Sequence, residues 1–398
     1  MSTIDRHDEQ RARSALAWRG RFPQNDIISL LENYPIHNLG ESTSQDLLFG
    51  DVVDLIGLDV LREVRLGYGS AAGSTALRAR IAELTGVTAE EVITTQGAAL
   101  GLYLLAVEHC RQGDEVVIVT PTFPPTRDAM LGSGLSVKTV PLGFDTGYRI
   151  DAEVIAGALT PATKLVCIAT PQNPSGVAAR IADVDALLGH MERVCPDAVL
   201  LVDETYRDAT YGDAPIPSSF ASTSPRIITS GSISKAHGAP GLRCGWLTVH
   251  DTDLRARLIV AKMNIVLSGS VLDEAVALAI LDAQDRVLQP RRLLLECALE
   301  TVERWQADEC HRIDWIRPDG GAMCCLRLRS DVFDDAAVVR FWDALPNLGL
   351  QLGNGEWFGE SSRIARLGFG YLPFQQLSPA LDQLTIALDL ATSTAPLA

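Results

Sequence analysis

Short apolar runs alternate with longer amphipathic stretches through the first two thirds of the chain, and this alternation predicts strands and helices in turn. The apolar runs favour strands over residues 91–95, 115–120, 136–141, 164–170, 198–203, 226–230 and 245–249. The intervening stretches favour helices over residues 74–85, 98–110 and 181–194, and the start of another at 126–132. Continuous apolar strands separated by helices are typical of a mostly parallel sheet with helices on both faces. The predicted fold class is therefore α/β.

The pattern changes after Thr252, where residues 254–263 and the stretch on to about residue 306 favour helix. Residues 311–398 predict a smaller α+β unit with strands over 323–328 and 363–369 and helices over 334–345 and 378–392. A chain of 398 residues is long enough for two domains, and we expect their boundary inside the long helical stretch. Residues 1–45 show little periodicity and end in a turn-like Asn38–Gly40, followed by Glu41.

Composition excludes several classes of protein. Hydrophobic residues make up 47% and charged residues 21% of the chain, which excludes disorder, and a net charge of −16 argues against nucleic acid or an anionic membrane as partner. The first 14 residues are charged and lack the apolar core of a secretory signal, and the longest nearly unbroken apolar stretch, 97–107, is far short of the roughly 20 residues that span a bilayer. Eight cysteines without a CxxC pair or metal-ligand spacing predict no zinc site and a reducing, cytoplasmic compartment.

Lys235 is the strongest candidate for covalent chemistry. It follows the apolar run at 227–228 and lies among small residues, with Ser232 before it and Arg243 after a glycine-rich loop. A nearby cation such as Arg243 lowers an amine's pKa, and an amine of lowered pKa can attack a carbonyl and hold it as a Schiff base. The competing interpretation is a solvated loop lysine.

Two further clusters follow strand ends. Gly97, Ala98 and Ala99 open a helix directly after a strand, where small residues let backbone N–H groups approach an anion; alone, they indicate only a tight turn. Asn173, in QNPSG, has an amide that the turn leaves free, or it is an ordinary Asx-turn asparagine. A third glycine cluster, at residues 67–73, imitates a dinucleotide-binding loop, but the segment before it is charged and we expect a loop leading into a helix.

Acidic, phenolic and guanidinium groups complete the set. Asp203 ends the apolar run VLLVD, where a charge is costly unless a cation pairs with it, and Tyr206 follows three residues later; the alternative for Asp203 is a helix cap. Arg366 interrupts an apolar strand and is suited to bidentate capture of a carboxylate, with an internal ion pair as the alternative. One cofactor with an aldehyde, a phosphate, a ring nitrogen and a phenolic oxygen accounts for all of these groups, and that cofactor is pyridoxal 5′-phosphate (PLP).

The ordered motifs carry a family resemblance. The stretch Ser232–Trp246, SISKAHGAPGLRCGW, follows GAA, PTF, NPSG and DETY and precedes the arginine in IARLGFG. Over essentially residues 60–375 the chain resembles the class I/II aminotransferases of the fold-type I PLP-dependent enzymes. The resemblance implies a mixed, mostly parallel seven-stranded sheet in a large domain, residues 46–285, a small domain, residues 286–398, and an N-terminal segment, residues 1–45, packed with the small domain.

The resemblance also assigns roles. Lys235 would carry the cofactor, and Asp203 would pair with its ring nitrogen. The other cofactor contacts would be Ala98, Ala99, Ser232 and Arg243 at the phosphate, Tyr206 and Asn173 at the ring hydroxyl, Phe123 stacked on the ring, and Tyr68 reaching the neighbouring subunit of a homodimer. Arg366, Asn173 and Gly40 would bind the substrate, with Lys235, Asp203 and Tyr206 as the catalytic group.

The implied activity is exchange of an amino group between an L-α-amino acid and a 2-oxo acid. Other PLP reactions on an amino acid remain open at this point, namely those of an oxidase, a β-lyase, a decarboxylase or a cyclase. The substrate side chain also remains open: Glu41 would face a cationic side chain, or it is a surface acid or a cap. A PLP-sensing regulator is disfavoured because the first 60 residues hold no basic cluster.

Overall fold

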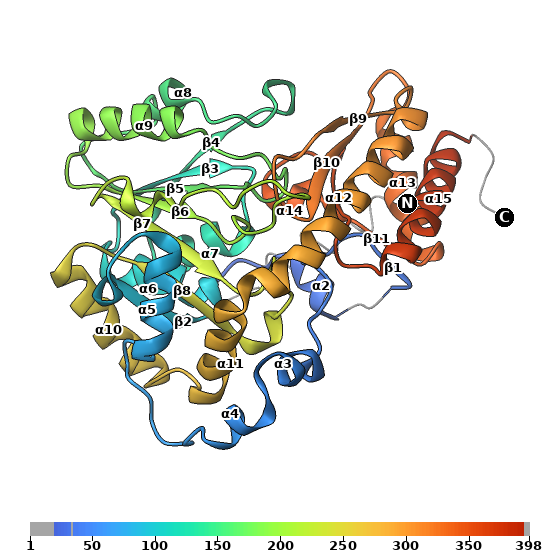
Figure 1. The fold of residues 1–398 in the computed structure, drawn as a ribbon. Coiled ribbons are helices and arrows are strands. Elements are labelled where there is room, and N and C mark those ends of the chain that lie inside the picture. Colours follow the sequence, from blue (N-terminus) through green and yellow to red (C-terminus); the bar gives the residue numbers. More distant parts are fainter. Residues whose placement is uncertain (1–19, 33–34, 394–398) are drawn as a thin grey trace.

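The computed structural model describes residues 20–32 and 35–393, so the charged N-terminus and part of the predicted segment 1–45 lie outside the described residues. A seven-stranded sheet forms the centre of the larger part of the molecule (Figure 1). Its strand order is β2 (Val92–Gln96), β8 (Cys244–Thr248), β7 (Ile227–Ser232), β6 (Val199–Asp203), β5 (Thr163–Ala169), β3 (Glu115–Thr120) and β4 (Ser136–Pro141). Only β8 runs antiparallel to its neighbours, so the predicted mixed, mostly parallel sheet is confirmed.

Helices cover both faces of this sheet, because its strands are apolar on both sides. One face packs against α8 (Ala152–Ala156) and α9 (Ile181–Val194), and the other against α6 (Gly97–Glu108), α7 (Pro124–Gly132) and α10 (Thr252–Val266). Helices α5 (Thr75–Thr85) and α11 (Val271–Asp282) pack together beside the β2–β8 edge. Figure 1 shows α8 and α9 above the sheet and α5, α6 and α10 below it.

A second, four-stranded antiparallel sheet lies beside the first, in the order β12 (Gly353–Asn354), β13 (Ile364–Gly368), β10 (Met323–Leu328) and β9 (Ile313–Ile316). Side chains alternate along β10, so Cys324 and Leu326 join the core under three helices while Cys325 joins the core of the large sheet. The three helices are α12 (Gln284–Glu309), α13 (Asp335–Asn347) and α15 (Phe374–Thr392). The division of the chain at residue 285 stays a prediction.

The first described residues form a small two-stranded sheet with a segment near the end of the chain. Strand β1 (His37–Asn38) pairs in parallel with β11 (Leu350–Gln351), next to the small sheet. Short helices follow, α3 (Phe49–Ile56) and α4 (Leu58–Arg62), with α2 (Ser29–Glu32) before β1 and α14 (Gly355–Phe358) before β13. The predicted turn after Asn38 is present, because the Asn38 side-chain oxygen accepts hydrogen bonds from the Gly40 and Glu41 backbone N–H groups.

The stretch predicted to be helical from residue 254 to about 306 is helical and consists of three helices, α10, α11 and α12. Leu267 adopts a positive φ of 62° and ends α10, and the Ser270 hydroxyl accepts from the Asp273 N–H to cap α11. These breaks depend on cap geometry that apolar spacing does not report. Strand β9 also escaped prediction, because three of its four residues are only partly buried.

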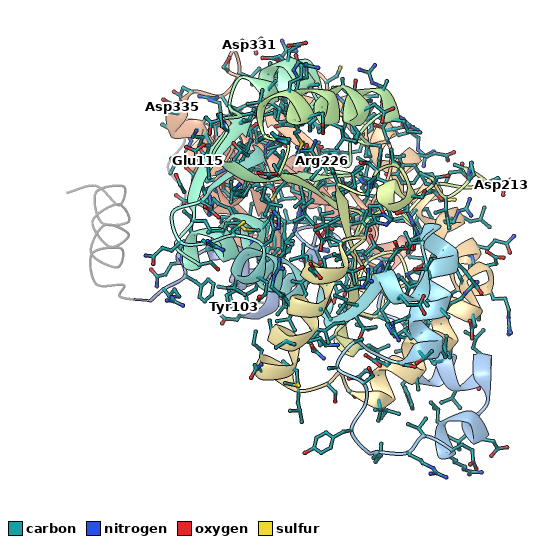
Figure 2. The ribbon with its side chains drawn as sticks, turned by 90° about the vertical axis from the view of Figure 1, so that its left-hand side faces the viewer. Tyr103, Glu115, Asp213, Arg226, Asp331 and Asp335 are labelled. Atoms are coloured by element: carbon teal, nitrogen blue, oxygen red, sulfur yellow. The ribbon has the colours of Figure 1, made fainter. Side chains whose placement is uncertain are left out.

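Acidic side chains lie at the edge of the molecule, in keeping with its net charge. Figure 2 shows Asp213, Asp331 and Asp335 at the periphery, and all three are exposed. Among the described residues no helix combines the length and the hydrophobicity that crossing a membrane requires.

Candidate active site

Lys235 lies just beyond the carboxyl end of β7, whose six residues are all buried. Its ammonium nitrogen Nζ is 3.3 Å from Ser42 Oγ, 3.6 Å from Glu41 Oε1 and 5.6 Å from the centre of the Tyr206 ring. The predicted alternative of a solvated loop lysine is therefore wrong. The other three lysines of the chain have partners elsewhere: Lys138 with Glu115, Lys164 with Asp197 and Lys262 with Thr94.

Tyr206 and Asn173 meet because they follow the adjacent parallel strands β6 and β5 at the same edge of the sheet. The Tyr206 hydroxyl accepts from Asn173 Nδ2 at 3.2 Å and lies 2.9 Å from Ser42 Oγ. Both side chains are buried, Asn173 at 3% and Tyr206 at 4% exposure. The contact links the predicted phenol to the Lys235 neighbourhood through Ser42.

Arg366 enters the site from β13 of the small sheet and is only 2% exposed. Its Nη1 donates to Asn173 Oδ1 at 2.9 Å and its Nη2 to the Gly40 carbonyl oxygen, while the guanidinium carbon lies 4.8 Å above the Phe358 ring. Among the described residues Arg366 forms no salt bridge within 4.0 Å, although the Glu41 carboxylate attracts it at longer range. Nε has no hydrogen-bond partner within the described chain, so a buried cation keeps donor capacity for an incoming anion.

Asp203 closes β6 at the same edge. Its Oδ1 accepts three hydrogen bonds, from the Thr205 N–H, the Thr205 hydroxyl and the Ser230 hydroxyl. Burial raises the pKa of Asp203, against the lowering effect of these hydrogen bonds and of the Lys235 charge. The protein thus fixes one carboxylate oxygen, and a nearby cation would stabilise the charge of this half-buried carboxylate. The predicted alternative of a helix cap is wrong, because in the described chain no helix begins after β6 before Phe220 and the bond from the Thr205 N–H belongs to a turn.

The start of α6 forms a small cradle. Gly97 has a φ of 70° and its N–H donates to the Arg243 carbonyl oxygen at 2.8 Å. A methyl group on Gly97 would lie 2.2 Å from Arg243 Nη2, and one on Gly245 would lie 2.6 Å from the Ala98 nitrogen. Strand pairing sets Ser232 opposite Gly245 and Gly245 opposite Thr95, directly before the helix. One helix N-terminus therefore brings together the backbone at Ala98 and Ala99, the Ser232 end of β7 and the Arg243 guanidinium. Such a helix N-terminus is suited to binding an anion.

The two predicted aromatic residues outside these contacts differ in exposure. Phe123 is half-buried at the N-cap of α7. Tyr68 is 89% exposed on the loop before α5. Its position contributes nothing to the site of its own subunit.

The structure adds residues that the sequence did not single out. Ser42 bridges Lys235 and Tyr206, Thr205 and Ser230 hold Asp203, and Phe358 supports Arg366. The prediction that Glu41 is a surface acid is wrong, because its side chain is 17% exposed and faces Lys235. Ser42, Ser230 and Thr205 lie close to residues that the sequence did single out, and this proximity was the only indication in the sequence of their roles.

A lysine at a strand end, a buried acid, a phenol and an anion cradle on this mixed sheet define a PLP-dependent enzyme of fold type I. The chain belongs to the family described as aminotransferase class I and II, which matches residues 48–373.

Relatives agree with this assignment. The chain is 30% identical to capreomycidine synthase of Streptomyces vinaceus over 79% of each protein, and 28% identical to arginine–pyruvate transaminase of Pseudomonas aeruginosa over 77% of this chain and 78% of the relative. Its fold is similar to the crystal structure of a PLP-dependent aminotransferase from Streptococcus suis, with a TM-score of 0.84 and 24% identity over 94% of this chain and all of that one.

Proposed function

We propose that the protein exchanges an amino group between an L-α-amino acid and a 2-oxo acid, with Lys235 as the residue that carries PLP. The residues present fit this cofactor. Gly97 leaves room for the Arg243 guanidinium that a side chain would fill, and Asp203 keeps one carboxylate oxygen without a protein donor in the described chain. Ala98, Ala99, Ser232 and Arg243 would hold the phosphate, Asp203 the ring nitrogen, Tyr206 and Asn173 the ring hydroxyl, and Phe123 the ring face.

When bound, PLP supplies an aldehyde that joins the substrate amine and a ring that withdraws electrons from the substrate Cα. The chain's own residues do the rest. Arg366 and Asn173 bind the α-carboxylate, with the Gly40 carbonyl holding the guanidinium in place. The Lys235 amine would remove the proton from Cα of the amino acid. In the reverse half of the reaction it would return a proton to Cα of the 2-oxo acid's carbon skeleton. Asp203 would hold the ring nitrogen of the bound cofactor, and its negative charge would keep that nitrogen protonated.

The observation that carries the proposal is the pairing of Lys235 with Arg366 across Asn173, Tyr206 and Ser42. A continuous set of contacts runs from the guanidinium through Asn173 and Tyr206 to Ser42 and the lysine nitrogen. A carboxylate held by Arg366 thus places the α-carbon of an amino acid on the Lys235 side of the site. This is the arrangement that proton transfer at Cα requires.

We also propose a homodimer that works in the cytoplasm. Tyr68 and the neighbouring Leu66 are 89% and 80% exposed, and the exposed Leu267 and Leu272 belong to the same surface region, around a hollow shared by loop 66–68 and residues 268–272. A second copy of the chain covering this surface would receive Tyr68 at its own phosphate cradle. All eight cysteines are free and six are buried, which supports a reducing compartment.

A second candidate is a PLP reaction on an amino acid that ends in a product other than a keto acid. Capreomycidine synthase, a relative with 30% identity, is named as a synthase and not as a transaminase. The two candidates differ in product, because only transamination leaves pyridoxamine phosphate and a 2-oxo acid.

The test mixes the PLP-loaded protein with each of the twenty common L-amino acids and identifies cofactor and products by mass spectrometry. We expect pyridoxamine phosphate and the matching 2-oxo acid for at least one of them. Lys235→Ala is expected to bind PLP without a covalent bond and to lose turnover, whereas Lys164→Ala, which removes a partly exposed lysine outside the site, keeps it. Turnover by Lys235→Ala contradicts the proposal.

A further inference from the structure

Glu41 is a charged group in the site to which the proposed mechanism gives no task. Its carboxylate oxygen Oε1 lies 3.6 Å from Lys235 Nζ and accepts from the Ser42 N–H at 2.8 Å. The segment that carries it is fixed, since the Asn38 side chain holds the Glu41 N–H and the Gly368 N–H donates to the Leu39 carbonyl oxygen. A methyl group on Gly368 would lie 1.7 Å from the Glu41 carbonyl oxygen, so the segment packs against β13 without slack.

The charges around this carboxylate keep it ionised in the free site. Burial raises the pKa of Glu41, but Lys235 and Arg366, with hydrogen bonds from Ser42 and Lys235, outweigh it and hold the pKa below its usual value. From the described part of its own segment Asp46 also interacts with it, and the pKa of Asp46 is raised by burial and by Glu41.

Under the proposed function both cations become committed elsewhere. The Lys235 amine is taken up by the cofactor and Arg366 by the substrate carboxylate, which leaves Glu41 a poorly solvated anion with reduced compensation. The substrate brings a cation to this spot, because its amine must reach the position that Lys235 Nζ now holds. An α-ammonium group arriving there lies within reach of Glu41 Oε1.

An ammonium nitrogen has no lone pair and cannot form the new bond until it loses a proton. We propose that Glu41 binds the incoming α-ammonium group and accepts its proton, a catalytic role that rests on the proposed function. One N–H bond breaks and one O–H bond forms on the carboxyl group, and the freed lone pair makes the bond to carbon. Glu41 passes this proton to the Lys235 nitrogen and then relays a second proton from the same substrate nitrogen. Two N–H bonds thus break on the substrate and two form on Lys235 as its own bond to carbon breaks, so Lys235 leaves as a neutral amine.

The experiment compares the PLP-loaded wild type, Glu41→Gln and Asp46→Asn. The second-order rate of the absorbance change on mixing is measured from pH 6.5 to 9 with the fastest common amino acid and with aminooxyacetate. The aminooxy group is unprotonated throughout this range and needs no base. Asp46→Asn removes an exposed carboxylate from the same segment and serves as the matched control.

We expect Glu41→Gln to react with the amino acid about a hundredfold more slowly at pH 7, in line with the usual contribution of a general base, and to recover most of the rate by pH 9. Its reaction with aminooxyacetate stays within twofold of wild type, and Asp46→Asn matches wild type with both reagents. An equal loss with aminooxyacetate, or a pH profile parallel to that of wild type, overturns the role of Glu41. The absorbance change on mixing is measured before any product forms. If the wild type then yields no 2-oxo acid, that result overturns the proposed transamination but not the role of Glu41.

Discussion

A single methyl group at Gly97 is expected to weaken PLP binding strongly, by more than its backbone strain alone explains. The Gly97→Ala methyl would lie 2.2 Å from Arg243 Nη2 and 3.0 Å from its guanidinium carbon, so the exposed arginine side chain must move away from the helix N-terminus. Loss of a hydrogen bond between charged groups is worth about 1.5–3 kcal/mol. That corresponds to a dissociation constant for PLP about ten- to a hundredfold higher.

Backbone strain adds a separate cost that a control isolates. Alanine at the positive φ of Gly97, 70°, destabilises the fold by about 1–2 kcal/mol. Gly147 has a φ of 66° and no atom within 4 Å of an added methyl, so Gly147→Ala carries the same strain without touching the site. The assay is fluorescence titration of the apoproteins with PLP, together with urea unfolding of the same apoproteins.

The two variants should lose similar stability, and only Gly97→Ala should lose cofactor affinity. Equal PLP affinities for Gly97→Ala and Gly147→Ala would refute the reasoning, because they would show that the Arg243 position against α6 does not matter for the phosphate.

Two further predictions concern Asp203 and Lys262. Asp203→Asn keeps the oxygen that Thr205 and Ser230 contact but loses the charge. Removal of the Cα proton should therefore slow about a hundredfold or more, while the unfolding free energy changes little. Single-turnover kinetics with deuterated substrate measure this rate, and an unchanged rate removes the role assigned to Asp203. Burial lowers the pKa of Lys262 from 10.5 to about 8. Between these two pH values the unfolded chain binds more protons than the folded chain, so the unfolding free energy rises with pH, by at most about 3 kcal/mol. Lys262→Met should flatten that rise in urea unfolding between pH 8 and 10, and a wild-type slope in the variant contradicts the assignment.

The large sheet is readable from the sequence because all of its strands except the edge strand β4 are largely buried on both faces. A continuous apolar run such as VLLVD needs no partner to be recognised, and its last residue, Asp203, then lies at the carboxyl edge with the other strand ends. Lys235, Asn173 and Tyr206 were found in the same way, since each follows such a run by a few residues.

Contacts between distant segments were not readable. Ser42 and Glu41 reach Lys235 from a segment almost two hundred residues earlier. Glu41 was considered only for the substrate side chain, and no local pattern marks the contact of either residue with Lys235. Their position depends on the pairing of β1 with β11 and on the close packing against Gly368. Polar residues that act through such long-range contacts escape a reading of periodicity, because periodicity reports only which side of one element is buried.

The central claim is that Lys235 is the covalent attachment point of PLP, and the chain offers a clean test because it contains only four lysines. Purified protein loaded with PLP is reduced with borohydride, digested and mapped by mass spectrometry. We predict one pyridoxyl group, on the peptide that contains Lys235. A label on Lys138, Lys164 or Lys262, or no label at all, would contradict the account.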